Sequence, residues 1–206
     1  MKIAGFQPIS LCDYPGRVAA VVFTQGCNFR CPFCHNGGLI PRDVAGQRLM
    51  PQGELLQRLA ERAMLLEGLV ISGGEPTLQG DLIPFVEQVR GLGLLVKLDT
   101  NGSRPDVLQA LIERRLVDFV AMDVKAPFER YAAVTRVDAD TAEIEASIHL
   151  IAASGLPHEF RTTFVRPLLT DSDMEALRRA LPPGSPYRVQ AFVPELAADP
   201  CLRRAS

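Results

Sequence analysis

Short apolar runs rich in β-branched residues recur along this chain of 206 residues, and an amphipathic stretch separates each run from the next. An apolar run of this kind predicts a strand buried on both faces, and an amphipathic stretch predicts a helix. The predicted strands comprise residues 19–24, 68–72, 94–100, 119–124, 159–165 and 187–193. Strands that alternate with crossover helices form a parallel sheet, because each helix returns the chain to the end of the sheet where the next strand starts.

Residues that favour the ends of helices support this alternation. Those expected to begin a helix are Pro51, Asp81, Pro105, Asp138 or Asp140, and Thr170. Those expected to end one are Gly91 and Gly93, residues 155–157 and residues 182–184. Six parallel strands could form an open doubly wound sheet or part of a barrel, but a complete eight-stranded barrel needs about 250 residues. The sequence therefore predicts an α/β fold, a partial (β/α)6 TIM-like barrel with parallel strands.

Length and composition fit a single domain over residues 1–206, because 47% of the residues are hydrophobic and can form a core. The core is expected over about residues 15–193, and the tail, residues 194–206, is expected to be partly disordered. The net charge of −2 gives no general attraction to nucleic acid or to an anionic membrane. No apolar run reaches the roughly 20 residues of a membrane span. The N-terminus lacks a secretory signal, so we expect a cytoplasmic protein.

Polar side chains recur on one face of the later predicted strands. Side chains alternate along a strand, so residues of one parity face the helices and those of the other face inward. The inward parity carries Asp99, Asp123, Lys125, Arg161, Thr163 and Gln190. Buried charges need a partner or a ligand, so these residues predict either an internal ion-pair network or a binding site. Their place near the carboxyl ends of parallel strands favours a site.

Three of the five cysteines, Cys27, Cys31 and Cys34, lie directly after the first predicted strand. An odd number of cysteines, three of them close together in the sequence, indicates a reducing compartment and a metal site instead of disulfides. Three thiolates can hold three irons of a [4Fe–4S] cluster and leave the fourth iron open. Structural zinc is the main alternative, but it needs four protein ligands and would have to recruit Cys12 or Cys201. A redox dithiol is less favoured, because it uses only two cysteines.

Three further motifs follow later predicted strands. Gly73 and Gly74 let backbone groups approach a ligand closely, and the Glu75 carboxylate can accept hydrogen bonds from an ammonium group. Residues 99–102 bring polar side chains to the same edge, although Asn-Gly is also a common turn. Residues 123–125 place a lysine there, which suits a carboxylate or a ribose hydroxyl but also an internal salt bridge. Together the motifs predict a ligand with an amino-acid end and a nucleoside end.

These motifs resemble the radical S-adenosylmethionine (SAM) superfamily, through Cys27-x3-Cys31-x2-Cys34, the aromatic Phe33 and Gly73-Gly74-Glu75. Further segments resemble the activating proteins of glycyl radical enzymes, especially the branch that activates anaerobic ribonucleoside-triphosphate reductase. They are Gly5-Phe6-Gln7, Asp13-Tyr14-Pro15-Gly16, Phe23 to Pro32, Cys34-His35-Asn36, Asp99 to Gly102 and Asp123-Val124-Lys125. The resemblance covers about residues 2–192.

The resemblance implies roles for these residues. The three cysteines would hold a [4Fe–4S] cluster, and the amino and carboxylate groups of SAM would bind its open iron. The residues implied to contact SAM are Gly73, Gly74 and Glu75 at the amino-acid end, Phe33 and His35 at the adenine, and Thr100, Asn101, Asp123 and Lys125 at the ribose and carboxylate. Arg161, which faces inward, joins this set. In related activating proteins of pyruvate formate-lyase, a monovalent cation lies near the counterparts of Asp99, Thr100 and Asp123.

The implied reaction begins when a reduced cluster cleaves SAM to methionine and a 5′-deoxyadenosyl radical. That radical would take a hydrogen atom from a glycine of a partner. The resemblance favours anaerobic (class III) ribonucleotide reductase as this partner and flavodoxin or ferredoxin as the electron donor. One alternative is an activase of the pyruvate formate-lyase type. Another is a radical SAM enzyme that acts on a small molecule, as 7-carboxy-7-deazaguanine synthase does. A different class of function is a non-catalytic iron–sulfur or zinc protein.

Overall fold

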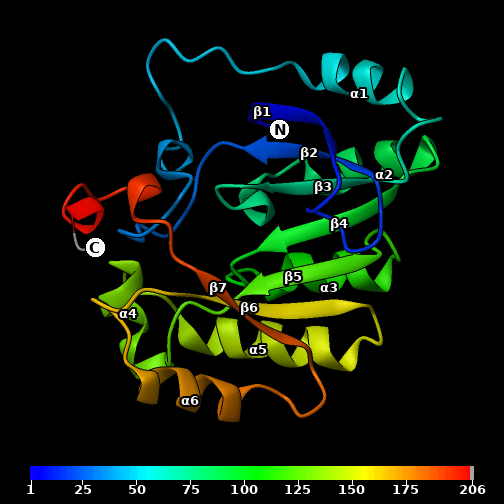
Figure 1. Cartoon of the computed structure of the whole chain (residues 1–206). Coiled ribbons are helices and arrows are strands. Elements are labelled where there is room, and N and C mark those ends of the chain that lie inside the picture. The colour runs from blue at the N-terminus through cyan, green and yellow to red at the C-terminus, as the bar shows by residue number, and fades with distance from the viewer. Residues whose placement is uncertain (205–206) are drawn as a thin grey trace.

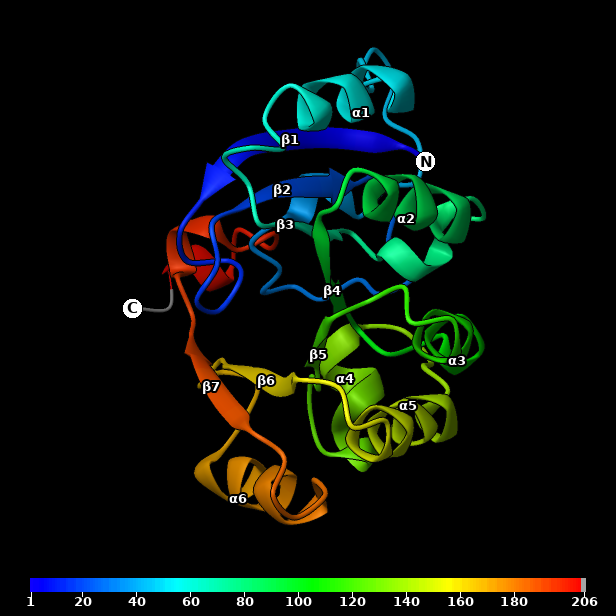
Figure 2. The ribbon, with the colours of Figure 1, turned by 90° about the vertical axis from the view of Figure 1, so that its right-hand side faces the viewer.

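Six parallel strands form the predicted sheet, and a seventh, antiparallel strand extends it at the N-terminal edge (Figure 1). The computed structural model describes residues 1–204. Its strands are β1 (Ile3–Ser10), β2 (Ala19–Thr24), β3 (Gly68–Gly73), β4 (Leu95–Thr100), β5 (Phe119–Asp123), β6 (His158–Phe164) and β7 (Tyr187–Ala191). They lie side by side in chain order. The sheet curves into a partial barrel that stays open between β1 and β7 (Figure 2), so the predicted fold class is confirmed.

The helices cover the outer side of the curved sheet (Figure 2). They are α1 (Gln52–Ala60), α2 (Leu82–Gly91), α3 (Pro105–Glu113), α4 (Tyr131–Thr135), α5 (Thr141–Ala153) and α6 (Asp171–Ala180). Five of them begin where the sequence predicts. Thr170, for example, forms a capping box with Asp173, and the Asp140 side chain caps α5. The short helix α4 was not predicted, and none of the described helices combines the length and hydropathy of a membrane-spanning segment.

Strand β1 corrects the prediction of six strands. It pairs with β2 in the antiparallel direction, and its pairing shifts register between Ile3 and Gly5 and again between Gln7 and Ser10. Glycine and proline are depleted in strands, so Gly5 and Pro8 obscure the strand pattern. An edge strand tolerates a proline because one of its sides has no ladder hydrogen bonds to lose.

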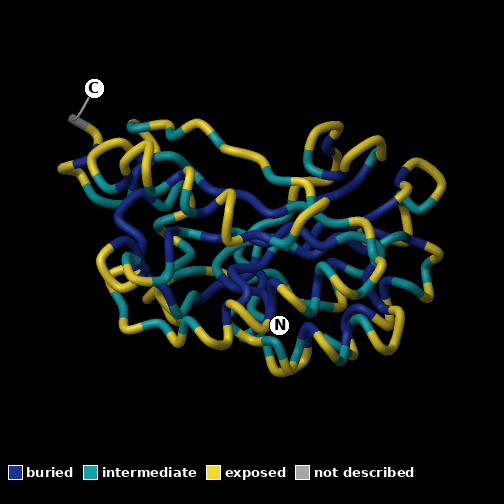
Figure 3. Tube along the Cα trace, turned by 90° about the horizontal axis from the view of Figure 1, so that it is seen from below, coloured by how far each residue is buried: buried dark blue, intermediate teal, exposed yellow. Residues whose placement is uncertain are grey.

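The alternation of side chains places two apolar clusters on the two faces of the sheet. Residues of one parity, such as Val22 of β2 and Ile71 of β3, pack under the helices in the main core. Residues of the other parity, such as Val21 and Val70, pack inside the barrel with Tyr14. Buried positions therefore run through the middle of the molecule, and the exposed ones lie on the periphery (Figure 3).

The inside of the barrel changes from apolar to polar along the strands. The Tyr14 ring lies edge-on to Phe119 at the first residue of β5, with 6.1 Å between ring centroids. The side chains of Asp99, Asp123 and Arg161 lie nearer the carboxyl ends of their strands. The barrel thus has an apolar floor and a charged rim.

The C-terminal tail is ordered over the part that the structure describes, which corrects the expectation of partial disorder for residues 194–204. Ala197 is fully buried. The Asp199 N–H donates to the Pro32 carbonyl at 2.8 Å, and the Asp199 carboxylate lies 2.8 Å from the Arg136 guanidinium. The tail therefore packs against the cysteine loop. Residues 205–206 lie outside the described part of the chain.

Two glycines let the loop after β3 approach the loop after β2. Gly73 has a φ of +120°, and a Cβ atom there would lie 2.2 Å from the Thr24 nitrogen. A Cβ atom on Gly74 would lie 2.2 Å from the carbonyl oxygen of Gly26. That oxygen accepts a hydrogen bond from the Glu75 N–H at 2.8 Å. No larger residue fits either position without moving backbone.

We predict that Gly74→Ala lowers the free energy of unfolding by about 3 kcal/mol or more, because the added methyl group overlaps backbone that cannot rotate away. Gly80→Ala is the matched control, since a Cβ atom there meets nothing within 4 Å. We expect its effect to stay within about 0.5 kcal/mol. Urea titrations of both variants measure the difference, and equal stabilities would contradict the close approach.

Candidate active site

The carboxyl ends of the parallel strands surround a cavity of about 400 Å³. All of the site residues predicted from the sequence line it: Cys27, Cys31, Phe33, Cys34, His35, Gly73, Gly74, Glu75, Asp99, Thr100, Asn101, Asp123, Lys125 and Arg161. Thr163 and Gln190, which the inward parity also identified, line it too. The structure therefore brings together motifs that lie more than 130 residues apart in the chain, while their individual roles stay predictions.

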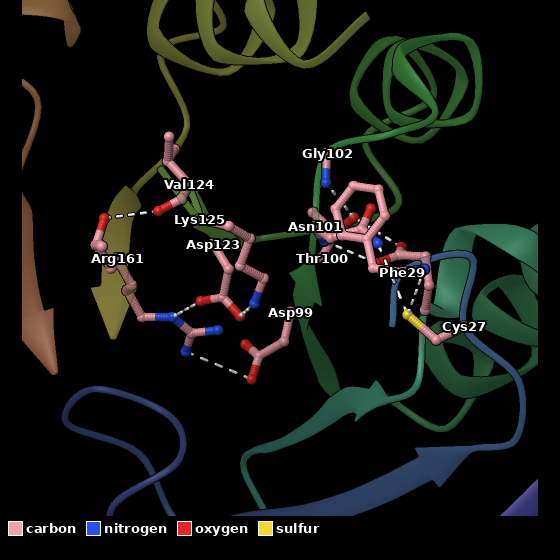
Figure 4. Close-up of polar contacts among 12 residues, drawn as sticks. Cys27, Phe29, Asp99, Thr100, Asn101, Gly102, Asp123, Val124, Lys125 and Arg161 are labelled. Carbon is pink, nitrogen blue, oxygen red and sulfur yellow. Dashed lines mark hydrogen bonds and ion pairs between the residues drawn. The ribbon is translucent and has the colours of Figure 1, made fainter. Parts of the chain in front are cut away.

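The cysteine loop is held by hydrogen bonds from several directions. The Phe29 N–H donates to the Cys27 sulfur at 3.4 Å, and the Cys34 N–H donates to the Cys31 carbonyl at 3.1 Å. The Asn101 side-chain amide, from the loop after β4, lies 3.9 Å from the Cys27 sulfur (Figure 4). Donors aimed at a sulfur stabilise its thiolate, which is the form that binds metal.

Burial keeps the thiols protonated until a metal binds. It raises the pKa of Cys27 to about 11 and that of Cys31 to about 12, and it also raises the pKa of Cys34. A coordinating metal displaces the thiol proton, so a buried set of thiols can still serve as ligands. Three sulfurs on one cavity fit the three protein ligands of a [4Fe–4S] cluster with an open iron.

The zinc alternative receives no support from the remaining cysteines. Cys12 and Cys201, either of which zinc would have to recruit, are exposed, and neither lines the cavity. Within residues 1–204, no three histidine, cysteine, aspartate or glutamate side chains are arranged so that they could hold a single metal ion. A site for one ion is therefore not formed by the described side chains.

The Glu75 carboxylate is fully buried and accepts four hydrogen bonds from the protein. Two come from the N–H and hydroxyl of Thr77. The Thr100 hydroxyl and the Asn101 N–H supply the others, each at 2.7 Å. Burial raises the pKa of Glu75, although these hydrogen bonds oppose the rise. Glu75 thus connects two strand-end loops, and its predicted contact with an ammonium group stays a prediction.

Charged side chains from β5 and β6 meet on the inner wall of the cavity. The Lys125 ammonium lies 3.0 Å from Asp123, and the Arg161 guanidinium lies 2.8 Å from the same carboxylate (Figure 4). Burial opposes ionisation of Asp123, but the charges of Arg161 and Lys125 outweigh it and hold its pKa at about 2. Burial likewise opposes the charge on Lys125, yet Asp123 raises the Lys125 pKa above its ordinary value.

His35 joins the cysteine loop to the end of β7. Its ring stacks on Phe192, with 5.8 Å between centroids and 18° between ring planes. Its Nε2 atom accepts a hydrogen bond from the Val193 N–H at 3.2 Å, which requires the neutral ring. Burial lowers the pKa of His35, and the positive charge of Lys125 lowers it further.

Several residues that shape the site were missed by the sequence reasoning. The side-chain oxygen Oδ1 of Asn28 accepts a hydrogen bond from the Asn101 side-chain amide at 2.9 Å, and the Tyr131 hydroxyl accepts one from the Lys125 backbone N–H at 3.1 Å. Asp13, from the β1–β2 connection, lines the cavity. Asn28 and Asp13 belong to segments that carry the resemblance to activating proteins, so the sequence contained a signal that could have identified them. Tyr131 offered none, because its helix was not predicted.

The chain is similar in sequence to proteins that are named for three different activities. A protein of Methanocaldococcus jannaschii, named provisionally as a glycyl-radical enzyme activating enzyme, is 35% identical over 96% of this chain and 82% of its own length. A pyruvate formate-lyase-activating enzyme of Clostridium pasteurianum is 30% identical over 60% of this chain and 52% of its own. A 7-carboxy-7-deazaguanine synthase of Koribacter versatilis is 30% identical over 75% of this chain and 65% of its own.

A solved structure shares the fold of this chain, and a family profile matches its sequence. Streptococcus suis SuiB bound to S-adenosylmethionine superposes with a TM-score of 0.61 at 13% identity, over 82% of this chain and 39% of SuiB. The profile of the radical SAM superfamily matches residues 21–181. The chain therefore belongs to the radical SAM superfamily, which uses a [4Fe–4S] cluster and S-adenosylmethionine, and it is a radical SAM enzyme homologous to glycyl-radical enzyme activating enzymes.

Proposed function

We propose that this enzyme generates a glycyl radical on a partner enzyme, and that the partner is an anaerobic (class III) ribonucleoside-triphosphate reductase. The observation that carries the proposal is the similarity to the activating-enzyme relative of M. jannaschii, because it extends over 96% of this chain. The choice of reductase rests on the resemblance of the N-terminal and cysteine segments to that branch of activating proteins. The electron donor would be a flavodoxin or a ferredoxin.

In this proposal the residues of the cavity bind and orient the cofactor. Cys27, Cys31 and Cys34 would hold the cluster, which when bound and reduced would supply the electron for reductive cleavage of S-adenosylmethionine. Lys125 offers a fixed positive charge to the cofactor's carboxylate, since Asp123 keeps the ammonium protonated. The loop at Gly73 and Gly74 offers backbone groups without side chains that would block them. Phe33 and His35 offer flat faces to the adenine.

The shape of the barrel supports a protein as substrate. The sheet ends at β1 on one side and at β7 on the other, and these edges do not pair (Figure 2). The cavity is lined from both sides of this gap, by Asp13 before β2 and by Gln190 of β7. A loop that carries the target glycine could enter from the side and reach the reacting carbon. Positioning of this kind is the main contribution of the protein when a cofactor carries the chemistry.

A second candidate is a radical SAM enzyme that acts on a small molecule. The similarity to a 7-carboxy-7-deazaguanine synthase over 75% of this chain favours it. In that case the cavity would bind a pterin beside the cofactor, and no partner protein would be needed. The two candidates share the cofactor site and differ only in what occupies the space next to it.

We predict that the protein, with its cluster reconstituted anaerobically, forms 5′-deoxyadenosine from S-adenosylmethionine when dithionite is added. Cys31→Ala should abolish the product, because Cys31 is one of only three thiols on the cavity. Cys201→Ala is the matched control and should retain the rate of the parent, since Cys201 is exposed and does not line the cavity. Chromatography of the quenched mixture measures the product. Equal yields from the Cys31 variant and the parent would contradict radical SAM chemistry at this site.

We further predict that the reconstituted enzyme, mixed with purified anaerobic ribonucleoside-triphosphate reductase, S-adenosylmethionine and dithionite, produces a glycyl-radical doublet in the electron paramagnetic resonance spectrum. Pyruvate formate-lyase in place of the reductase tests the other activase, and a pterin substrate tests the small-molecule alternative. A doublet on pyruvate formate-lyase alone would move the assignment to that partner. Consumption of the pterin without any doublet would contradict the activase proposal.

A further inference from the structure

Five charged side chains form a continuous chain of ion pairs on the inner wall of the barrel. The ammonium of Lys97 pairs with Asp99 on the same strand. Arg161 lies 3.5 Å from Asp99 and 2.8 Å from Asp123, and Lys125 lies 3.0 Å from Asp123 (Figure 4). Positive and negative charges alternate from Lys97 to Lys125, so every carboxylate in the chain has a cation on each side.

Arg161 stands between the two carboxylates. Asp99 and Asp123 come from neighbouring strands, β4 and β5, and the Arg161 guanidinium from β6 contacts both. The Arg161 side chain is only 10% exposed. A free cation that bridged these two carboxylates would need the position that the guanidinium holds.

Lys97 is the second cation that pairs with Asp99, on the side nearer the apolar floor of the barrel. It is only 2% exposed, and its ammonium lies 5.9 Å from the centroid of the Phe119 ring near the apolar floor. A buried ammonium is stable only when it is paired, and Asp99 is its partner. Among these five side chains, three positive charges face two carboxylates. Arg161 also lies 3.9 Å from the carboxylate of Glu159, which pairs with Arg188 as well. Each of these three carboxylates is therefore already paired with cations of the protein.

The residues do not fit the monovalent cation that the resemblance to pyruvate formate-lyase activating proteins implied. Both carboxylates expected to bind it, Asp99 and Asp123, are paired with cations of the protein. The third expected ligand, Thr100, donates its hydroxyl hydrogen to Glu75 at 2.7 Å, and its hydroxyl oxygen accepts a hydrogen bond from the Gly102 N–H at 3.1 Å. The position expected for the cation is thus surrounded by carboxylates that charged side chains of the protein already neutralise.

We propose that Lys97 and Arg161 are permanent counter-cations of Asp99 and Asp123, so that this site needs no free monovalent cation. Both are positioning residues: they fix the carboxylates beside Lys125 without themselves supplying the reaction. The inference rests on the proposed cofactor site but not on the identity of the partner. A failure to activate any glycyl radical enzyme would not decide it, because the salt experiments below test it separately.

The test compares the full-length protein with its cluster in potassium, sodium and tetramethylammonium chloride at equal ionic strength. Tetramethylammonium is too large and too weakly coordinating to replace a buried ammonium. For the parent we expect the same thermal midpoint in all three salts within about 1 °C. We also expect the same dissociation constant for S-adenosylmethionine, measured by calorimetry, within about twofold.

Lys97→Met keeps most of the side-chain volume but leaves Asp99 without the ammonium. We expect its thermal midpoint to be about 3 °C higher in potassium or sodium than in tetramethylammonium, because a bound ion stabilises the folded state by mass action. Its affinity for S-adenosylmethionine should fall about fivefold or more when the small cations are removed. The double variant Lys97→Met with Asp99→Asn removes both charges and should lose the salt specificity.

Lys2→Met is the matched control, since Lys2 is a half-exposed lysine that pairs with Asp43 at the surface. It should behave as the parent does in every salt. If the Lys97 variant does not fold, Arg161→Met gives the second measurement, with the same expected preference for small cations. A parent protein that is itself stabilised by potassium or sodium, or variants that show no cation preference, would overturn the proposal.

Discussion

One buried carboxylate, that of Glu75, connects the loops that form the candidate active site. Its side chain accepts hydrogen bonds from Thr100 at the end of β4 and from Asn101 just after it, and its own N–H donates to the Gly26 carbonyl next to Cys27. Removing a partner from a buried carboxylate costs more than the hydrogen bond alone, because the charge stays desolvated. The loops after β2, β3 and β4 therefore keep one relative position, and the cysteines are fixed with respect to the residues across the cavity.

The inside of this small barrel holds several charged side chains, and two features of the structure stabilise them there. The floor is apolar, with Tyr14 packed on Phe119, and it excludes water from below. Above it Lys97 pairs with Asp99, and Arg161 pairs with Asp123, which offsets the cost of burying these charges. Burial raises the pKa of Cys31, but the positive charge of Lys125 opposes this rise and so favours the metal-binding thiolate.

Much of this arrangement could be predicted from local patterns. Parity along the strands identified Asp99, Asp123 and Arg161 as inward-facing, because an apolar core leaves one face for polar groups. Contacts between distant segments could not be predicted. Nothing near Ala197 or Asp199 in the sequence indicates that the tail packs on the cysteine loop. Lys97 has the same inward parity as Asp99, but its burial and its pairing with Asp99 became evident only in the structure.

The cysteine loop is supported by elements from the middle and from the C-terminal end of the chain, and this links assembly of the metal site to folding. Asn101 contacts Cys27 from one side, while Val193 contacts His35 and Asp199 contacts Pro32 from the other. Burial of the thiols raises their pKa, so a cluster must supply enough binding energy to displace their protons. A loop that is already held in place loses less conformational entropy when the metal binds. The tail and the β4 loop therefore favour cluster binding by holding the loop in place, without contributing a ligand of their own.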